Sequence, residues 1–364
     1  MPKRIFDTAP RLTGALLGLV SAWLLVGCEE TPRNMLDPAG DSAALSATFF
    51  NNLTILLSCI MLLVAAIFVY CLVRFRERKG DTSEPKQVHG NMAMEIGWTI
   101  VPTLIVIAIT IPTLQAIFEL EAVPEGDKVE IEVIGKQWWW EYDYINEGFT
   151  TANEMHVEVD TVVQINVTSA DVIHAWWVPR VSGKRDATPG RIYPMYFTPT
   201  LVGEFDGQCA ELCGASHALM GIKLFVHPKE GSNSYDEWVK KQKAVAVKPN
   251  TAQEKRGLAL FKEKGCIACH VIRGDGETEL IPRKARLATT GPDLTHVGSR
   301  TTIAAATLKN TRENLVRWID DPLAIKEEAI MANPRFNANY DVSREEAEDI
   351  AAVRPLPSGP APRN

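Results

Sequence analysis

Cys209-Ala-Glu-Leu-Cys213-Gly-Ala-Ser-His217-Ala-Leu-Met220 brings two thiols, an imidazole and a thioether together within 12 residues, and His174 lies 35 residues before the first of them. Soft sulfur ligands and imidazole favour copper over metals that prefer oxygen, and a His/Cys set with a weak Met ligand is typical of electron transfer. Two thiolates exceed what one such copper needs, so these residues predict two copper ions bridged by both sulfurs. Each ion would keep one histidine, which leaves weak positions for Met220 and for a main-chain carbonyl such as that of Glu211.

A structural zinc site is the alternative interpretation of the same residues. Two cysteines and two histidines form a closed tetrahedral ligand set that suits zinc. A motif gains weight with the number of fixed positions that it explains. Zinc gives the methionine and the glutamate no role, whereas a copper pair explains six positions together: His174, Cys209, Glu211, Cys213, His217 and Met220.

This pattern, Cys-x-Glu-x-Cys-Gly-x-x-His-x-x-Met preceded by a distant His, resembles the dinuclear copper (CuA) motif of cytochrome c oxidase subunit II, and the chain matches every position. The resemblance implies a cupredoxin-like sandwich in which His174 follows a strand and the cysteines lie on a loop. Nitrous-oxide reductase carries a similar copper motif. The rest of the chain must therefore distinguish the two enzymes.

The N-terminal residues have the pattern of an export signal. Three basic residues precede or begin an apolar stretch from Leu12 to Val26, and Gly27-Cys28 follows it. This arrangement predicts a signal peptide over residues 1–27. The small residue before Cys28 resembles a bacterial lipobox, which implies a lipoprotein with its lipid on that sulfur. An ordinary signal peptide or an uncleaved anchor is the alternative.

Two apolar runs, Leu53 to Val73 and Ile96 to Phe118, have 21 and 23 residues and no charged side chain, enough to cross a bilayer as helices. We expect a transmembrane hairpin over residues 45–120. Prolines within such helices are tolerated in membrane bundles. A short loop rich in Lys and Arg is expected on the cytoplasmic side, so everything after Phe118 lies outside a bacterial inner (cell) membrane, on the periplasmic side. The basic residues of this loop are Arg74, Arg76, Arg78, Lys79 and Lys86.

Residues 121–230 show the alternation of a β-sandwich, for example Val129 to Val133 and Val162 to Val167. A cluster of aromatic residues follows the first of these runs. Trp139 and Tyr142 are expected in the core. The family resemblance places Trp138 on the exposed surface that receives electrons, where its replacement by Gln would slow copper reduction.

The resemblance also implies a magnesium ion beside the copper loop. Glu211 would offer its carboxylate there while its carbonyl faces copper, and Asp186 matches the family's segment bordering that ion. Hard carboxylate oxygens suit magnesium. Further ligands would have to come from a partner subunit.

A c-type haem motif follows a polar, Lys-rich segment, residues 231–250, which we expect to be a linker. Cys266-Ile-Ala-Cys269-His270 predicts thioether bonds from both cysteines and iron ligation by His270. A redox Cys-x-x-Cys motif is the alternative, but it gives the adjacent histidine no role. Met331, the only Met after Met220, is the expected sixth ligand, and His296 is the alternative. Residues 251–364 are thus expected to form an all-α cytochrome c domain.

The whole chain resembles a caa-type oxidase subunit II, with a cytochrome c domain fused after the copper domain. The fusion argues against nitrous-oxide reductase, which would also need many more histidines than the seven here. The membrane helices contain no His to hold haem or copper, so the oxygen-reducing site must lie on a catalytic subunit I among further membrane subunits. An acidic face around the copper site would steer a basic donor such as cytochrome c toward it, and plain solubility is the alternative role of that charge.

The resemblance implies the electron-accepting subunit of a proton-translocating oxidase. Glu95, at the start of the second helix, matches the acidic residue at the cytoplasmic mouth of a proton path in related oxidases. An interfacial charge that anchors the helix end is the alternative for Glu95. For the chain, the alternative is a stand-alone membrane-tethered electron carrier or copper-delivery module. Membrane lipid is an expected partner, and nucleic acid is not.

Overall fold

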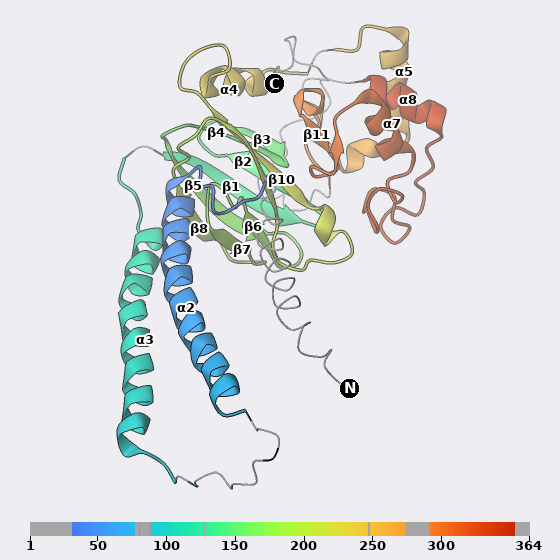
Figure 1. Cartoon of the computed structure of the whole chain (residues 1–364). Coiled ribbons are helices and arrows are strands. Elements are labelled where there is room, and N and C mark those ends of the chain that lie inside the picture. Colours follow the sequence, from blue (N-terminus) through green and yellow to red (C-terminus); the bar gives the residue numbers. More distant parts are fainter. Residues whose placement is uncertain are drawn as a thin grey trace, which may run out of the picture.

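Two long helices, α2 (Asp41–Arg74) and α3 (Met92–Glu121), form a hairpin that leaves one end of a β-sandwich (Figure 1). The computed structural model describes residues 31–76, 80, 87, 89–126, 128–246, 248–273 and 291–353. The expected signal peptide, Cys28 and the loop residues Arg78, Lys79 and Lys86 lie outside these ranges.

Both helices have the length and composition of membrane spans. Their apolar side chains are almost all exposed, as expected for helices whose solvent is lipid. Pro102 and Pro112 lie inside α3, as the membrane interpretation allows. At its 1.5 Å rise per residue, α2 spans about 50 Å and exceeds a hydrocarbon core of about 30 Å. In its first turns, Ala43 and Ala47 are buried against the protein rather than exposed to lipid.

Contacts at both helix ends hold the sandwich on the hairpin. Before α2, the backbone at Ala39 accepts a hydrogen bond from the N–H of Thr200 at 2.8 Å. Gly40 comes so close to the chain that a Cβ there would lie 2.2 Å from the carbonyl oxygen of Val181. After α3, Arg185 pairs with Glu121 at 2.6 Å. The sandwich is therefore fixed at the ends of the two membrane helices.

The sandwich consists of two five-stranded sheets. The strands are β1 (Lys128–Lys136), β2 (Trp139–Tyr144), β3 (Phe149–Ala152), β4 (Glu154–Glu158), β5 (Val162–Ser169), β6 (His174–Trp177), β7 (Lys184–Ala187), β8 (Tyr193–Phe197), β9 (Gly203–Cys209) and β10 (Gly221–His227). One sheet has the order β3-β2-β1-β5-β8 and the other β4-β10-β9-β6-β7. The pairs β1 with β5 and β4 with β10 are parallel, and the others are antiparallel. The expected cupredoxin-like sandwich is confirmed.

Alternating apolar residues build its core. Along β5, β9 and β10, buried and half-buried positions alternate as the period of a strand requires. Trp139 and Tyr142 are 8 % and 0 % exposed, which confirms the expectation that both are core residues. The largest fully buried side chains include Trp140 and Trp176.

The segment expected as a linker is partly structured. Helix α4 (Tyr235–Lys243) occupies the middle of residues 231–250, and its Tyr235 and Val239 are buried in the core of the sandwich. Trp238 stacks on His156 with ring centroids 4.1 Å apart. The Lys-rich composition hid an apolar face that packs on the copper domain, so only the residues after α4 can act as a linker.

His156 and His227 form a half-buried pair beneath α4, with Nδ1 of His156 2.8 Å from Nε2 of His227. Burial lowers the pKa of both imidazoles, that of His156 most strongly. The unfolded chain, whose histidines titrate near about 6.5, therefore binds protons at a pH where the folded chain does not. The contribution of these histidines to the free energy of unfolding is therefore complete above about pH 6.5 and is lost progressively below it.

We expect the free energy of unfolding of the sandwich to decrease between about pH 7 and about pH 5, by up to about 1.4 kcal/mol per pH unit for each histidine that stays neutral. Unfolding of the full-length chain, followed by Trp fluorescence at several pH values, measures this slope. His156→Gln removes one titrating group and should make the slope shallower. A slope unchanged by that substitution would contradict the assignment.

The C-terminal unit contains α5 (Ala252–Glu263), α7 (Arg312–Asp320), α8 (Arg344–Ala352), the 3₁₀ turns η2 (Cys266–Ala268) and η3 (Val297–Ser299), and the hairpin β11 (Thr302–Ile303) and β12 (Leu308–Lys309). Capping boxes at Thr251 and Ser343 start α5 and α8. The short α8 packs against α5 and α7 although Pro-rich sequence follows it. The predicted helical cytochrome c architecture is confirmed.

Gly257 allows α5 and α8 to cross in contact. A Cβ at this position would lie 1.9 Å from the carbonyl oxygen of Asp349, a backbone atom that cannot move aside cheaply. We expect Gly257→Ala to destabilise the C-terminal unit by about 1–3 kcal/mol, the usual cost of overpacking. Gly183→Ala, where a Cβ meets nothing within 4 Å, is the control. Guanidinium unfolding followed by haem absorbance tests this; equal midpoints for the two variants would contradict it.

Candidate copper centre and haem site

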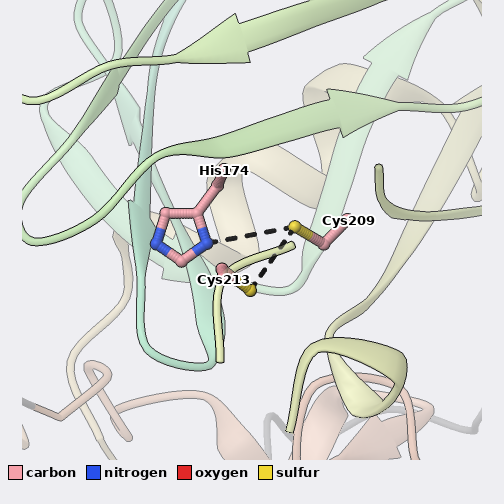
Figure 2. A group of neighbouring side chains, drawn as sticks. All are labelled: His174, Cys209 and Cys213. Carbon is pink, nitrogen blue, oxygen red and sulfur yellow. Dashed lines mark hydrogen bonds between the residues drawn. The ribbon is translucent and has the colours of Figure 1, made fainter. Parts of the chain in front are cut away.

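Both cysteines and His174 converge at one end of the second sheet. His174 begins β6 and Cys209 ends β9, and these two strands pair with each other. The following loop returns Cys213 so that its Sγ lies 3.8 Å from that of Cys209. The Nδ1 of His174 lies 3.9 Å from the Cys209 Sγ (Figure 2). These three ligand atoms lie within 4.8 Å of one another, and the residues are buried.

The other three predicted ligands surround the same sulfurs. The carbonyl oxygen of Glu211 lies 3.3 Å from the Sγ of Cys209. On the other side, Nδ1 of His217 is 3.5 Å and Sδ of Met220 is 3.9 Å from the Sγ of Cys213. The 3₁₀ turn η1 (His217–Leu219) spaces His217 and Met220 around that sulfur. All six residues singled out in the sequence are brought together.

This donor set fits a pair of copper ions. Its atoms are sulfur, imidazole nitrogen and one carbonyl oxygen, and among the described residues no carboxylate belongs to the cluster. Each sulfur faces one histidine nitrogen, so two bridged ions would each find an imidazole. The carbonyl and the thioether lie beside different sulfurs, one for each ion. A single zinc ion would use neither.

Neighbouring side chains orient this cluster. Nε2 of His174 lies 2.8 Å from Oδ1 of Asp171, which places the imidazole proton there and leaves Nδ1 for a metal. The carbonyl of Cys213 accepts hydrogen bonds from Gln137 at 2.7 Å and from the indole of Trp138 at 3.2 Å. Sequence reasoning missed Asp171 and Gln137. The carboxylate three residues before a ligand histidine is a signal that could have identified Asp171.

Without metal, the two thiols share their protons unequally. A hydrogen bond from Cys213 lowers the pKa of Cys209 to about 3, against the opposing effect of burial. The thiolate so formed raises the pKa of Cys213 well above its ordinary value, and burial adds to that rise. Burial, the largest single effect, disfavours a charged His174, but the hydrogen bonds and charges of Asp171 and Cys209 together outweigh it and raise the imidazole pKa. A metal ion would replace the remaining thiol proton.

Trp138 is 6 % exposed, so the expectation of an exposed tryptophan is wrong in this chain. It belongs to the core of the sandwich, and the C-terminal unit contacts its carbonyl oxygen through Nζ of Lys326 at 2.6 Å. Trp138, which contacts the copper loop, is thus covered by the protein itself. Its role in copper reduction stays a prediction.

The predicted magnesium and proton-path side chains lie outside the cluster of copper ligands, although the carbonyl of Glu211 belongs to that cluster. The Asp186 and Glu211 side chains are exposed, and the described part of the chain supplies no third carboxylate or imidazole to form a cluster with them. A magnesium site therefore depends on ligands from another subunit, as the sequence interpretation assumed. Glu95 lies exposed in the first turn of α3.

The haem motif is held by the segment that follows it. Cys266 and Cys269 are half-buried in and after η2. The Nδ1 of His270 donates to the carbonyl of Pro292 at 2.8 Å, which leaves Nε2 for iron. Gly291 packs so closely that a Cβ would lie 2.7 Å from Cε1 of that imidazole. Two thiols within four residues of an oriented, half-buried imidazole fit covalent haem attachment.

His296 is engaged elsewhere. Its Nε2 lies 3.0 Å from the carbonyl of Gln242 and 2.9 Å from that of Ala244, both in or just after α4. Two carbonyl acceptors require the proton on Nε2, so this nitrogen acts as a donor rather than as an iron ligand. Met331 is half-buried in a turn after α7.

Family models match three consecutive parts of the chain. Residues 31–116 match the transmembrane domain of cytochrome c oxidase subunit II, residues 147–226 its periplasmic domain, and residues 254–352 cytochrome c. A cytochrome c oxidase subunit 2 from Alkalihalophilus pseudofirmus is 36 % identical over 337 residues, which cover 90 % of this chain and 92 % of that protein.

The chain belongs to the cytochrome c oxidase subunit II family. A second relative, cytochrome c oxidase subunit 2 from Bacillus subtilis, is 34 % identical and covers 85 % of this chain and 88 % of its own length. The periplasmic domain of subunit II of a Bradyrhizobium japonicum cytochrome oxidase is 37 % identical, with 34 % of this chain and 97 % of that one covered and a TM-score of 0.31.

Family membership establishes the coarse picture. This subunit II is a membrane-anchored oxidase subunit with extracytoplasmic domains, and its C-terminal unit, called the haem domain below, is a cytochrome c domain. A subunit II belongs to an oxidase complex rather than to nitrous-oxide reductase. The copper motif and the haem motif lie on adjoining domains of one chain.

Proposed function

We propose that this subunit II relays electrons from an external donor through haem c and a dinuclear copper centre to an oxygen-reducing catalytic subunit. The convergence of six sulfur, nitrogen and carbonyl donors on one buried spot carries this proposal. Copper and haem bound here would each supply a one-electron redox couple. Cytochrome c or another respiratory donor is the expected source of electrons.

The chain's own residues hold and orient these groups. The two thiols that would bind copper lie at the end of β9 and on the loop after it, where Gln137 and Trp138 hold the carbonyl of Cys213, and Asp171 orients His174. Rigid placement of this kind lowers the reorganisation that accompanies each electron transfer. Cys266 and Cys269 would bind haem covalently, His270 would ligate iron on one side and Met331 on the other.

Replacement of Met331 by His tests the sixth ligand. Met/His ligation raises the potential of a cytochrome c relative to His/His, so the Met331→His variant should keep a six-coordinate haem at a lower reduction potential. His296→Gln should leave the potential and the haem spectrum unchanged, because His296 serves α4. A potential that shifts in His296→Gln and not in Met331→His would reverse the assignment. Redox titration of haem c in the purified complex is the measurement.

Purification of the complex from membranes tests the proposed function. An oxidase subunit should co-purify with a multi-helix protein that carries further haem, and anaerobic addition of reduced cytochrome c should reduce haem c before copper. A chain that purifies alone would favour the alternative of a stand-alone electron carrier or copper-delivery module. Reduction of copper ahead of haem c would contradict the proposed order.

A further inference from the structure

Two segments of the haem domain, residues 301–309 and 326–327, contact the copper loop, and we call them the clasp. The clasp binds residues that flank the copper ligands His217 and Met220 directly in sequence. The Ser216 hydroxyl donates to the carbonyl of Glu327 at 2.6 Å, and the Gly221 N–H donates to that of Ala305 at 2.9 Å. The Thr307 hydroxyl donates to the carbonyl of Leu219 at 3.1 Å.

Glu154 is a buried carboxylate on β4 whose hydrogen-bond donors come from the clasp. It is 2 % exposed. One of its oxygens accepts from the N–H and hydroxyl of Thr301, both at 2.9 Å, and from the N–H and hydroxyl of Thr302, both at 2.7 Å. A buried carboxylate is stable only when it is paired or well hydrogen-bonded. These donors are present only while the haem domain is docked.

Lys326 is the reciprocal charge, inserted from the haem domain into the copper domain. It is 4 % exposed, and its ammonium donates to the carbonyl of Trp138 at 2.6 Å and to that of Ala304 at 3.4 Å. Burial lowers the pKa of Lys326 to about 7. Trp138 itself donates to the carbonyl of the copper ligand Cys213. This contact therefore reaches the copper loop through one intervening residue.

The turn of the clasp has a backbone that alanine rarely adopts. Ala304, Ala305 and Ala306 have φ of 54°, 58° and 58°, in the left-handed region that disfavours residues with a Cβ. Such conformations persist where the surroundings hold them. The carbonyl of Ala305 accepts the bond from Gly221 of the copper domain, whereas that of Ala304 accepts from Lys326 of the haem domain itself. The docked copper domain therefore supports this turn through Gly221.

We propose that Glu154 and Lys326 are positioning residues that fasten the haem domain to the copper loop in one docked arrangement. This inference rests on the proposed function, because it concerns electron transfer between the two domains. A fastened domain transfers electrons across a fixed contact and needs no swinging motion of the residues after α4. The transfer rate should therefore be independent of solvent viscosity.

The test uses the intact oxidase complex with Glu154→Gln and, separately, Lys326→Met. Amide hydrogen exchange at Gly221 and Thr302 reports opening of the clasp, and we expect it to accelerate at least about tenfold, the factor that a lost charged hydrogen bond of about 1.4 kcal/mol represents. Haem-to-copper transfer after flash reduction should become slower and viscosity-dependent. Copper content and the spectra of both centres should stay those of the wild type, which a general loss of structure would not allow.

Matched controls lie on the same sheet. Glu158→Gln changes a carboxylate at the other end of β4 that accepts from the Thr161 hydroxyl, and Lys223→Met changes a lysine on β10 that pairs with Glu204 and Asp206 on β9. Both should leave exchange and transfer unchanged. Wild-type exchange and wild-type, viscosity-independent transfer in Glu154→Gln and Lys326→Met would overturn the proposal.

A second variant covers the case in which Glu154→Gln loses its fold. Thr302→Val removes one hydroxyl donor from the haem-domain side and should by itself accelerate exchange at Gly221. Where Glu154→Gln folds, a double-mutant cycle of the two should show coupling in the exchange rates. Additive effects would overturn the clasp. Because hydrogen exchange needs no electron transfer, the clasp can fail while the proposed relay stands, and the relay can fail while the clasp stands.

Discussion

Cys213→Ser will eliminate the copper pair and lower electron delivery to the catalytic subunit by at least about 100-fold. Loss of a residue that only hydrogen-bonds to a metal ligand costs about 10–100-fold in metal affinity or activity. Cys213 should matter more, because its own sulfur contacts Cys209, His217 and Met220. A serine hydroxyl is a harder and more weakly binding donor than a thiolate, so it cannot bridge two copper ions. Copper analysis and oxygen consumption with reduced cytochrome c are the measurements.

Cys59→Ser is the matched control for this substitution. The same atom is exchanged in α2, where Cys59 is exposed on a membrane helix far from the copper ligands in sequence and in fold. Copper content and oxygen consumption should remain at the wild-type level. Full activity in Cys213→Ser, or equal losses in both variants, would show that the thiol pair is not the metal bridge.

Replacement of both Cys266 and Cys269 by Ala will remove haem c and reduce donor-driven electron flow to background. Both thiols lie beside the imidazole of His270, and without them no thioether bond holds the porphyrin. Copper should remain, because its ligands lie on the copper domain. A small artificial reductant should still reduce the copper, which separates loss of the haem from loss of the fold.

Denatured-gel haem staining and copper analysis of the same sample check this prediction. The single replacements should leave partial covalent attachment, whereas Ile267→Ala between them should preserve it. Donor-driven oxygen consumption that survives the double replacement would mean that electrons reach copper without haem c. In that case the haem domain would serve another purpose.

Features carried by adjacent residues could be predicted from the sequence. Most of the copper ligands lie within a short loop, so their spacing alone identified all but His174. The apolar segment around it, residues 172–178, drew attention to His174. The spans of α2 and α3 followed from uninterrupted apolar runs, and the strands followed from alternation. In each case the pattern repeats the period of the local structure.

Features that depend on distant contacts could not be predicted. The contacts of the Trp138 carbonyl and the Glu154 carboxylate come from residues 188 and 147 positions further along the chain, which no local pattern reveals. Helix α4 was hidden because Lys residues dominate its composition, although Tyr235, Trp238 and Val239 have the spacing of one helix face. Its apolar face could have been identified from that spacing.

Metal analysis combined with electron paramagnetic resonance of the intact purified complex tests the central claim most directly. We expect each subunit II to hold a pair of copper ions, and the unpaired electron of the oxidised centre to interact equally with both copper nuclei. Zinc in place of copper, or a signal from one isolated copper ion, would contradict the account.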